Sequence, residues 1–337
     1  MTRNFTIALI MVVGTLSLSA QKIITVDNSE GSAAQFDDLQ TAIFSAEDGD
    51  ILYIHPSEID YGNIIVNKGL TLIGFAHSDP DKETSIARIN LDENSSNSRF
   101  SGLHVKGNFY VGESRSSATL SNITIENCRI DGTMDFPTAN VDNVTIRGSI
   151  FYHLGTTSNY TNALITNNII TGNLYVKNYQ SVNIRNNLFL NGSVRNLGYR
   201  TGTITIQNSI LYTSGGSRNW NYDGVVFENC MTHAVNGSNH VPLAGTNNID
   251  NIDPQFVDDT ERPGYYNELT DDFHLKQGSL AIDAGVSGED IGLYDGSGFT
   301  FNNFGYTGGI PTVKITAMTT TVAPGNNINV TINAQNH

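Results

Sequence analysis

Three basic residues, Lys106, Arg147 and Arg185, take equivalent places in a repeated phrase and are the first candidates for binding chemistry. Each comes one residue after an apolar position of the repeat, so all three side chains are expected to point outward from one face. Cations spaced like stacked strands could bind an acidic polysaccharide. The alternative is a surface ladder of charges, because Glu126 lies between Lys106 and Arg147 in this column. Exposed pairs of that kind contribute little to stability.

A second candidate for sugar binding is the aromatic pair Trp220 and Tyr222, which lies in a loop rich in Gly, Ser and Asn at 215–222. An exposed Trp220 beside Tyr222 would offer a flat surface on which a sugar ring can stack. A loop that plugs the end of the repeat array explains the same residues equally well.

The carboxyl and imidazole groups form no recognisable catalytic set. Asp131, Asp135 and Asp142 are the nearest acidic group in the regular region, and a glycosidase needs two such carboxyl groups, but Asp is also a common turn residue. The eight histidines are scattered, with none paired at metal-ligand spacing. Nucleophile elbows, phosphate loops and dinucleotide fingerprints are missing from the sequence. We therefore assign no catalytic residue and no metal ligand.

Acidic residues also gather between Asp250 and Asp272, where loop carboxylates could bind calcium. Their spacing is not that of an EF-hand, so a solvated loop is the simpler interpretation. No set of three acidic residues accompanies the basic column, and calcium-assisted β-elimination is therefore not supported. The sequence predicts no cofactor.

These candidates are positioned by a phrase in which two apolar residues flank one position and are followed by a mixed position and then Asn or Gly. Its second apolar residue recurs at Val105, Ile125, Ile146, Ile165, Ile184, Ile206 and Phe227. A second apolar column contains Ile130, Phe151, Ile170, Phe189 and Leu211. A repeat of about 20 residues indicates a solenoid, and alternation within the phrase has the period of a strand. Such short turns leave no room for crossover helices, and parallel crossovers are right-handed. The predicted fold is an all-β, right-handed parallel β-helix.

The Asn or Gly that ends each phrase is expected to bend the chain in the left-handed region, which Gly adopts freely and Asn tolerates. The Asn members are Asn127, Asn167, Asn186, Asn208 and Asn229. Stacked amides can bond to their copies one turn away, so this column predicts an asparagine ladder.

The rest of the chain predicts four segments. Residues 1–20 are typical of a secretory signal peptide, with Arg3, an apolar stretch at 5–13 and a small-residue cleavage zone at 17–20. Residues 21–50 are expected to cap the array, with a short amphipathic helix over 36–46. The β-helix itself is expected at 51–304, with irregular turns from about 232 that include 273–275 and 280–282. Residues 305–337 predict a linker and a β-hairpin or partial sandwich.

Charge and cysteine content narrow the partners and the compartment. The net charge is −15 and the pI about 4.7, so nucleic acid is a poor partner. No Cys follows the cleavage zone and no later stretch is long enough to cross a membrane, which predicts a secreted or cell-surface protein without a lipid anchor. Cys128 and Cys230 take the same place five turns apart, roughly 24 Å. That separation excludes a disulfide and predicts two separate, buried thiols.

Three groups of residues resemble the secreted bacterial right-handed parallel β-helix proteins of the pectate-lyase-like superfamily. They are the cap segment 36–43 with 48–54, the Ile-x-Asn turns, and the late segments 253–257, 273–275, 278–285 and 290–294. The resemblance covers residues 24 to 296 and implies the architecture. Members of that superfamily include lyases, hydrolases, adhesins and proteins with no known reaction, so the resemblance does not select an activity.

The sequence therefore leaves three hypotheses for function. The first is a β-helix protein that contacts carbohydrate or cell-surface material without catalysis, through Lys106, Arg147, Arg185, Trp220 and Tyr222. The second is a polysaccharide lyase or glycoside hydrolase acting on an acidic polysaccharide. The third is a structural or adhesive module whose C-terminal hairpin docks on a neighbour. The oligomeric state is not indicated.

Overall fold

The structure is a computed structural model that describes residues 21–336, with gaps at 113–118, 137–139, 156–158, 177–180, 197–202, 260–264, 297, 309–310, 320, 323–324 and 326. The predicted signal peptide lies outside the described residues. Within them, no helix combines the length and the apolar character that a membrane crossing requires.

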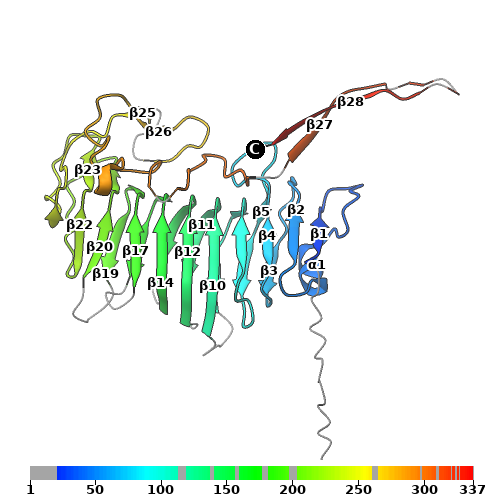
Figure 1. Cartoon of the computed structure of the whole chain (residues 1–337), viewed down its shortest axis with the longest axis horizontal. Coiled ribbons are helices and arrows are strands. Elements are labelled where there is room, and N and C mark those ends of the chain that lie inside the picture. The colour runs from blue at the N-terminus through cyan, green and yellow to red at the C-terminus, as the bar shows by residue number, and fades with distance from the viewer. Residues whose placement is uncertain are drawn as a thin grey trace, which may run out of the picture.

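The chain winds into a parallel β-solenoid with about 21 residues in each turn (Figure 1). One wall, sheet A, contains β1 (Ile23–Val26), β2 (Ile51–Ile54), β4 (Thr71–Ile73), β7 (Arg99–Ser101), β10 (Thr119–Glu126), β12 (Asn140–Arg147), β14 (Asn159–Thr166), β17 (Val182–Arg185), β20 (Ile204–Gln207), β22 (Val225–Glu228) and β24 (Gly245–Thr246). The described strand pairs of this sheet are all parallel, as the repeat predicted.

The remaining walls form one bent sheet, sheet B. It contains β3 (Asn63–Val66), β5 (Ser85–Ile86), β6 (Arg88–Leu91), β8 (His104–Val105), β9 (Phe109–Val111), β11 (Arg129–Asp135), β13 (Ile150–Leu154), β15 (Ile169–Ile170), β16 (Asn173–Val176), β18 (Leu188–Leu190), β19 (Ser193–Asn196), β21 (Ile210–Thr213) and β23 (Met231–Ala234). A register shift between Ile130 and Thr133 bends β11, so that its first part pairs with β8 and its second part with β9. Sheet B therefore supplies two walls of the coil.

The predicted apolar columns are confirmed by the register. Ile125, Ile146, Ile165, Ile184, Ile206 and Phe227 are successive partners in sheet A. Ile130, Phe151, Ile170, Phe189 and Leu211 are successive partners in sheet B. All of these side chains are at most 1% exposed and belong to one core inside the coil. Burial of each contributes roughly 1.5–3 kcal/mol, which is why the columns specify the coil.

The prediction that Val105 stacks in the same column as Ile125 is wrong. Phe100, not Val105, is the partner of Ile125, whereas Val105 pairs with Ile130 in sheet B. The chain turns at Gly102, whose φ of 67° is the left-handed bend that ends each sheet A strand. Residues 103–107 imitate the phrase because the polar His104 lies between the apolar Leu103 and Val105, as a polar residue does in most of the sheet A phrases.

The predicted cap is confirmed as α1 (Leu39–Ser45). Asp38 caps it by accepting a 2.7 Å hydrogen bond from the Thr41 amide, and Leu39, Ala42 and Ile43 are buried. The coil begins earlier than we expected, because β1 precedes this helix and pairs with β2.

The late irregular turns expected at 273–275 and 280–282 are not turns of the coil. Beyond β24 and a bridge from Met231 to Ile249, the chain leaves the coil, and β25 (Phe256–Asp258) pairs antiparallel with β26 (Asp272–Leu275). The described residues between 250 and 308, here called the C-terminal cover, run back along the outside of sheet B toward the end with α1 (Figure 1). A second apolar core lies beneath them, and it includes Ile169, Leu188, Ile210, Phe256, Phe273, Ile291 and Leu293.

The Asn column confirms the predicted backbone but not the predicted ladder. Asn127, Asn167, Asn186, Asn208 and Asn229 all have φ between 49° and 53°. Three of these amides donate to carbonyl groups of the C-terminal cover: Asn229 donates to Ala284 O, Asn186 to Asp290 O and Asn167 to Leu293 O. The cover lies against this column, and its backbone carbonyl groups accept the hydrogen bonds from these Asn side chains. The predicted ladder would instead have had each Asn donate to the equivalent Asn one turn away.

The structure also describes the two cysteines and the C-terminal hairpin. Cys128 and Cys230 are free and buried, and burial raises the pKa of each thiol to about 12. β27 (Pro311–Met318) and β28 (Val330–Asn336) form an antiparallel hairpin that extends away from the coil (Figure 1).

Candidate functional site: a pocket between the coil and the C-terminal cover

One outward-facing column of sheet B changes character halfway along the coil. In register order it contains Ser85, His104, Arg129, Ile150, Ile169, Leu188, Ile210 and Met231. The first three residues are polar and the last five apolar. The five apolar side chains are at most 5% exposed, because the C-terminal cover packs on them. The polar side chains cannot be covered in the same way, since each buried donor or acceptor needs a partner.

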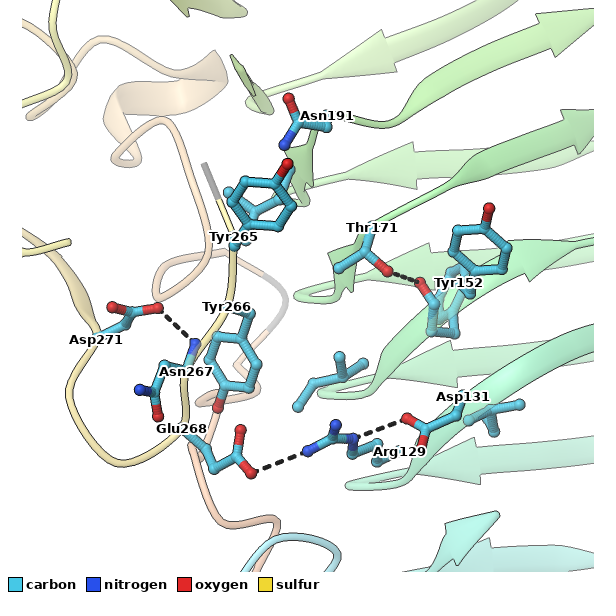
Figure 2. Close-up of a pocket in the computed structure, with 14 residues that line it drawn as sticks. Arg129, Asp131, Tyr152, Thr171, Asn191, Tyr265, Tyr266, Asn267, Glu268 and Asp271 are labelled. Carbon is cyan, nitrogen blue, oxygen red and sulfur yellow. Dashed lines mark hydrogen bonds and ion pairs between the residues drawn. The ribbon is translucent and has the colours of Figure 1, made fainter. Parts of the chain in front are cut away.

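A hollow of about 450 Å³ opens where the two halves meet, between the coil and the cover (Figure 2). From the coil it is lined by Arg129, Asp131 and Tyr152, and from the cover by Tyr265, Glu268 and Asp271. The volume falls within the roughly 300–1,000 Å³ of small-molecule sites.

Arg129 connects the two sides of the pocket. Its Nε donates to Asp131 Oδ1 at 2.9 Å, and its Nη1 donates to Glu268 Oε1 at 2.9 Å (Figure 2). The same Nη1 lies 3.4 Å from the Ser78 hydroxyl. Because Arg129 and Asp131 are two residues apart on one strand, both side chains leave the same face of β11.

A histidine extends this network deeper below the cover. His104 Nε2 lies 2.8 Å from Asp131 Oδ2, and its Nδ1 lies 3.0 Å from Glu83 Oε1. Lys106 Nζ lies 3.9 Å from the same Glu83 oxygen. A histidine between two carboxylates fits best with both ring nitrogens protonated.

The pKa values follow from burial and from these partners. Burial opposes ionisation of Asp131, but hydrogen bonds from His104 and Arg129 outweigh it and lower the pKa to about 2. Burial opposes the charge of His104, yet the bonds to Asp131 and Glu83 raise its pKa. His77 is the contrast: burial, followed by the charges of Arg129 and His104, lowers its pKa to about 3.

Tyrosines form the walls of the pocket. Tyr152 on β13 is 48% exposed and Tyr265 on the cover is 45% exposed. Tyr266 is a fixed wall, since its ring stacks on Phe273 with centroids 6.2 Å apart and its hydroxyl donates to Asn303 O at 2.9 Å. The pocket thus combines half-exposed aromatic faces with charged and amide groups at its base.

Metal binding finds no support in this arrangement. Among the described residues, no group of three or more His, Cys, Asp or Glu side chains is placed to hold a metal ion. The acidic residues from Asp250 to Asp272 are therefore not gathered into a calcium site in the described part of the chain.

Two of the predicted basic residues do lie on one outward column of sheet A. Arg147 and Arg185 flank Thr166 in register. The Nε and Nη2 atoms of Arg147 donate to Glu126 Oε2 at 2.9 and 2.7 Å, and its guanidinium lies 4.7 Å from the centre of the Phe299 ring. Glu126 is 3% exposed and also pairs with Arg99, so the Glu126 carboxylate occupies much of the expected cationic strip.

Lys106 does not belong to that strip. The register correction described above places it beyond β8 of sheet B, where it faces Glu83. The repeat pattern alone aligns it with Arg147, because the phrase around Lys106 imitates those of sheet A.

The aromatic loop is a plug rather than a platform. Trp220 is 1% exposed, its Nε1 donates to Gly192 O at 3.2 Å, and its ring lies 4.6 Å from that of His240. Tyr222 packs partly buried against the inner core, with the Arg195 guanidinium 5.5 Å from its ring centre. The buried Trp220 ring therefore cannot stack on a sugar in this arrangement.

The three grouped aspartates separate onto different walls. Asp131 lies in the pocket, Asp135 pairs with Tyr110 in the other part of sheet B, and Asp142 lies in sheet A beside Thr161. No two of them could act together on one bond.

The sequence held one signal that would have found the pocket. His104 and Arg129 are direct cross-strand partners, and Asp131 follows two residues after Arg129. Aligning residues 103–107 with the second apolar column would have placed these three side chains together. Tyr265, Glu268 and Asp271 could not be placed, because they come from a segment outside the repeat.

Comparison with known proteins adds little beyond the fold described above. No family model and no curated protein matches the chain. A search of solved structures finds a crystal structure of the pectate lyase Pel9A, with a TM-score of 0.47 and 15% identity, covering 86% of this chain and 98% of that one. A likeness this distant carries no argument about the site, so the parallel β-helix is established here by its own strand register.

Proposed function

We propose that this protein is an extracellular β-helix protein that binds carbohydrate in the pocket between the coil and the C-terminal cover. The observation that carries the proposal is the pair of half-exposed tyrosines, Tyr152 and Tyr265, at the walls of one pocket with polar groups at its base. The C–H face of a sugar ring can lie on an aromatic ring while its hydroxyl groups bond to Thr, Asn and carboxylate side chains. The extracellular location rests on the signal-peptide pattern of residues 1–20.

The test is a binding panel of soluble and insoluble glycans, with Tyr152→Ala and Tyr265→Ala as variants. Loss of one stacking ring is expected to weaken binding about tenfold, which corresponds to about 1.4 kcal/mol. Tyr53→Ala is the matched control, because Tyr53 is a partly exposed tyrosine on the outward side of sheet A. Binding that is equally affected by all three changes, or by none, would contradict the proposal.

A glycoside hydrolase is the second candidate, and the observation in its favour is that Asp131, Glu268 and Asp271 line the same pocket. Such an enzyme needs one carboxyl group protonated and another ionised. With its pKa lowered to about 2, Asp131 suits only the ionised role. Release of reducing ends in the same panel, abolished by Glu268→Gln, would favour hydrolysis over binding alone.

The strip of basic residues on sheet A remains a proposal with weaker support. It now contains Arg147 and Arg185 only, and Arg147 is engaged by Glu126. An acidic polysaccharide that loses affinity on Arg185→Ala but not on Tyr152→Ala would favour this strip over the pocket.

A further inference from the structure

We infer that the ligand of the pocket is an uncharged glycan and not an acidic one; this inference rests on the proposed function and specifies its ligand class. It reverses the expectation of an acidic polysaccharide that the basic residues of the sequence raised. Three features of the pocket lead to it, namely its formal charge, the engagement of its arginine, and the charges beyond the pocket.

The pocket is lined by more negative than positive groups. Its lining contains one guanidinium, that of Arg129, and three carboxyl groups, those of Asp131, Glu268 and Asp271. A uronic acid entering this space would lose hydration and meet like charges, a combination that costs binding free energy. Neutral hydroxyl groups can instead donate to these carboxylates, which are strong acceptors.

Arg129 is not available as a carboxylate clamp. A bidentate clamp uses either Nε with one terminal nitrogen or both terminal nitrogens together. Nε is held by Asp131 and Nη1 by Glu268, so each edge of the guanidinium already has one donor committed. Binding a ligand carboxylate in that way would require Arg129 to release one of two partners within the protein.

The charged groups beyond the pocket do not offset its excess of negative charge. His104 and Lys106 lie behind Asp131 and add two positive charges, but Glu83 beside them adds a fourth carboxyl group, so the formal charges still sum to an excess of negative charge. The whole chain carries a net charge of −15, which opposes the approach of a polyanion. Arg99 and Arg147, which lie on sheet A, are both paired with Glu126.

The experiment compares oligogalacturonate with its fully methyl-esterified form, which has the same sugars without the charge, together with neutral oligomers of glucose, xylose and mannose. Binding is measured by calorimetry at low and high salt with the wild-type protein, Tyr152→Ala and Glu268→Gln. We expect neutral oligomers to bind in a Tyr152-dependent way, and the methyl ester to bind at least about tenfold more tightly than the acid at low salt. Glu268→Gln is expected to narrow that difference, because it removes one negative charge and leaves Arg129 with a neutral, weaker acceptor.

The outcomes separate the two proposals. If oligogalacturonate binds more tightly than its methyl ester and Tyr152→Ala abolishes this binding, the pocket binds sugars but the inference of an uncharged ligand is wrong. If no member of the panel binds in a Tyr152-dependent way, the proposed function fails and the inference with it. A folded Tyr152→Ala variant, checked by circular dichroism, is required for either conclusion, and Tyr265→Ala provides an independent repeat from the opposite wall.

Discussion

The two halves of the outward column of sheet B lie beneath the same C-terminal cover but are stabilised by different physics. At Ile150, Ile169 and Leu188 the cover contributes apolar side chains, and the contact is a second core. At His104 and Arg129 it contributes Glu268, and the contact is a network of charges. The pocket opens where the two kinds of contact meet, because neither apolar packing nor ion pairing can continue into the other. A column that changes from polar to apolar along a solenoid therefore marks where a cover and a cavity are expected.

The largest expected effect tests the apolar half. Leu188→Ala should lower the free energy of unfolding by about 2–5 kcal/mol, because it leaves a cavity beneath the cover. The matched change is Leu164→Ala on the outward side of sheet A, where the side chain is only partly buried, and it should cost less than half as much. Chemical denaturation measures both. Equal losses would show that the cover does not pack on sheet B as described.

The next effect tests the amides that fix the cover to the coil. Asn208 accepts from the Val286 amide at 2.8 Å and donates to Glu289 Oε2 at 2.8 Å, with φ of 49°. Asn208→Ala should cost about 2–3 kcal/mol, from two hydrogen bonds and the left-handed backbone.

Two further variants separate the contribution of the hydrogen bonds from that of the backbone conformation. Asn208→Gly keeps the backbone conformation and removes only the bonds to the cover. Asn143→Ala removes a left-handed Asn with φ of 57° whose bond is to the exposed Asn122, so it reports the backbone without the cover. If Asn143→Ala costs as much as Asn208→Ala, the bonds to the cover contribute nothing measurable.

A smaller effect concerns the polar half of the column, whose contribution to stability should depend on pH. Because the folded-state pKa of His104 is raised above 6.5, its contribution to stability is fully present below that pH and is lost as the pH rises through the folded-state value. Asp131 has the opposite sign: with its pKa lowered from 3.8 to about 2, its contribution is present above 3.8 and is lost as the pH falls toward 2. The difference in melting temperature between wild type and His104→Gln should therefore shrink from about pH 6 to about pH 9.

The Leu188→Ala variant is the control for that titration, since a purely apolar contact should give a difference that does not change with pH. Taking differences also cancels most of the contribution of His77, because burial, the largest cause of its lowered pKa, is the same in wild type and in His104→Gln. A wild-type advantage over His104→Gln that grows with rising pH would contradict the charged state assigned to His104.

The smallest effect is expected outside the covered column. Arg147→Gln should change the free energy of unfolding by no more than about 1 kcal/mol, because its side chain is 38% exposed and Glu126 keeps Arg99. It should leave the binding of neutral glycans unchanged. A loss comparable to that of Leu188→Ala would mean that the ion pairs of sheet A matter as much as the apolar half of sheet B.

The repeat predicted the coil because inward residues must match their copies in every turn, which leaves a periodic record in the sequence. Ile125 and Phe151 could be placed from that record alone, and so could the free cysteines. The cover has no such periodic pattern, because Phe273 and Ile291 pack against the coil without repeating any residue pattern of the coil. The pocket could not be predicted from the repeat alone, because Arg129 lies in the repeat and Glu268 lies in the cover. Its two tyrosines could not be predicted either, because Tyr152 lies where the register between β11 and β13 shifts and Tyr265 lies in the segment outside the repeat.

The return path of the cover has a consequence for how the molecule opens. Stacked repeats contact only their neighbours and ordinarily fray one at a time from the ends. Here one continuous segment bonds to Asn229 near the last turn and, through Thr307 and Tyr306, to Gly74 and Asp79 near the first. Turns that are distant along the axis are thereby coupled, so progressive fraying gives way to a single cooperative transition. Amide hydrogen exchange should then show similar protection in early and late turns instead of a gradient along the axis.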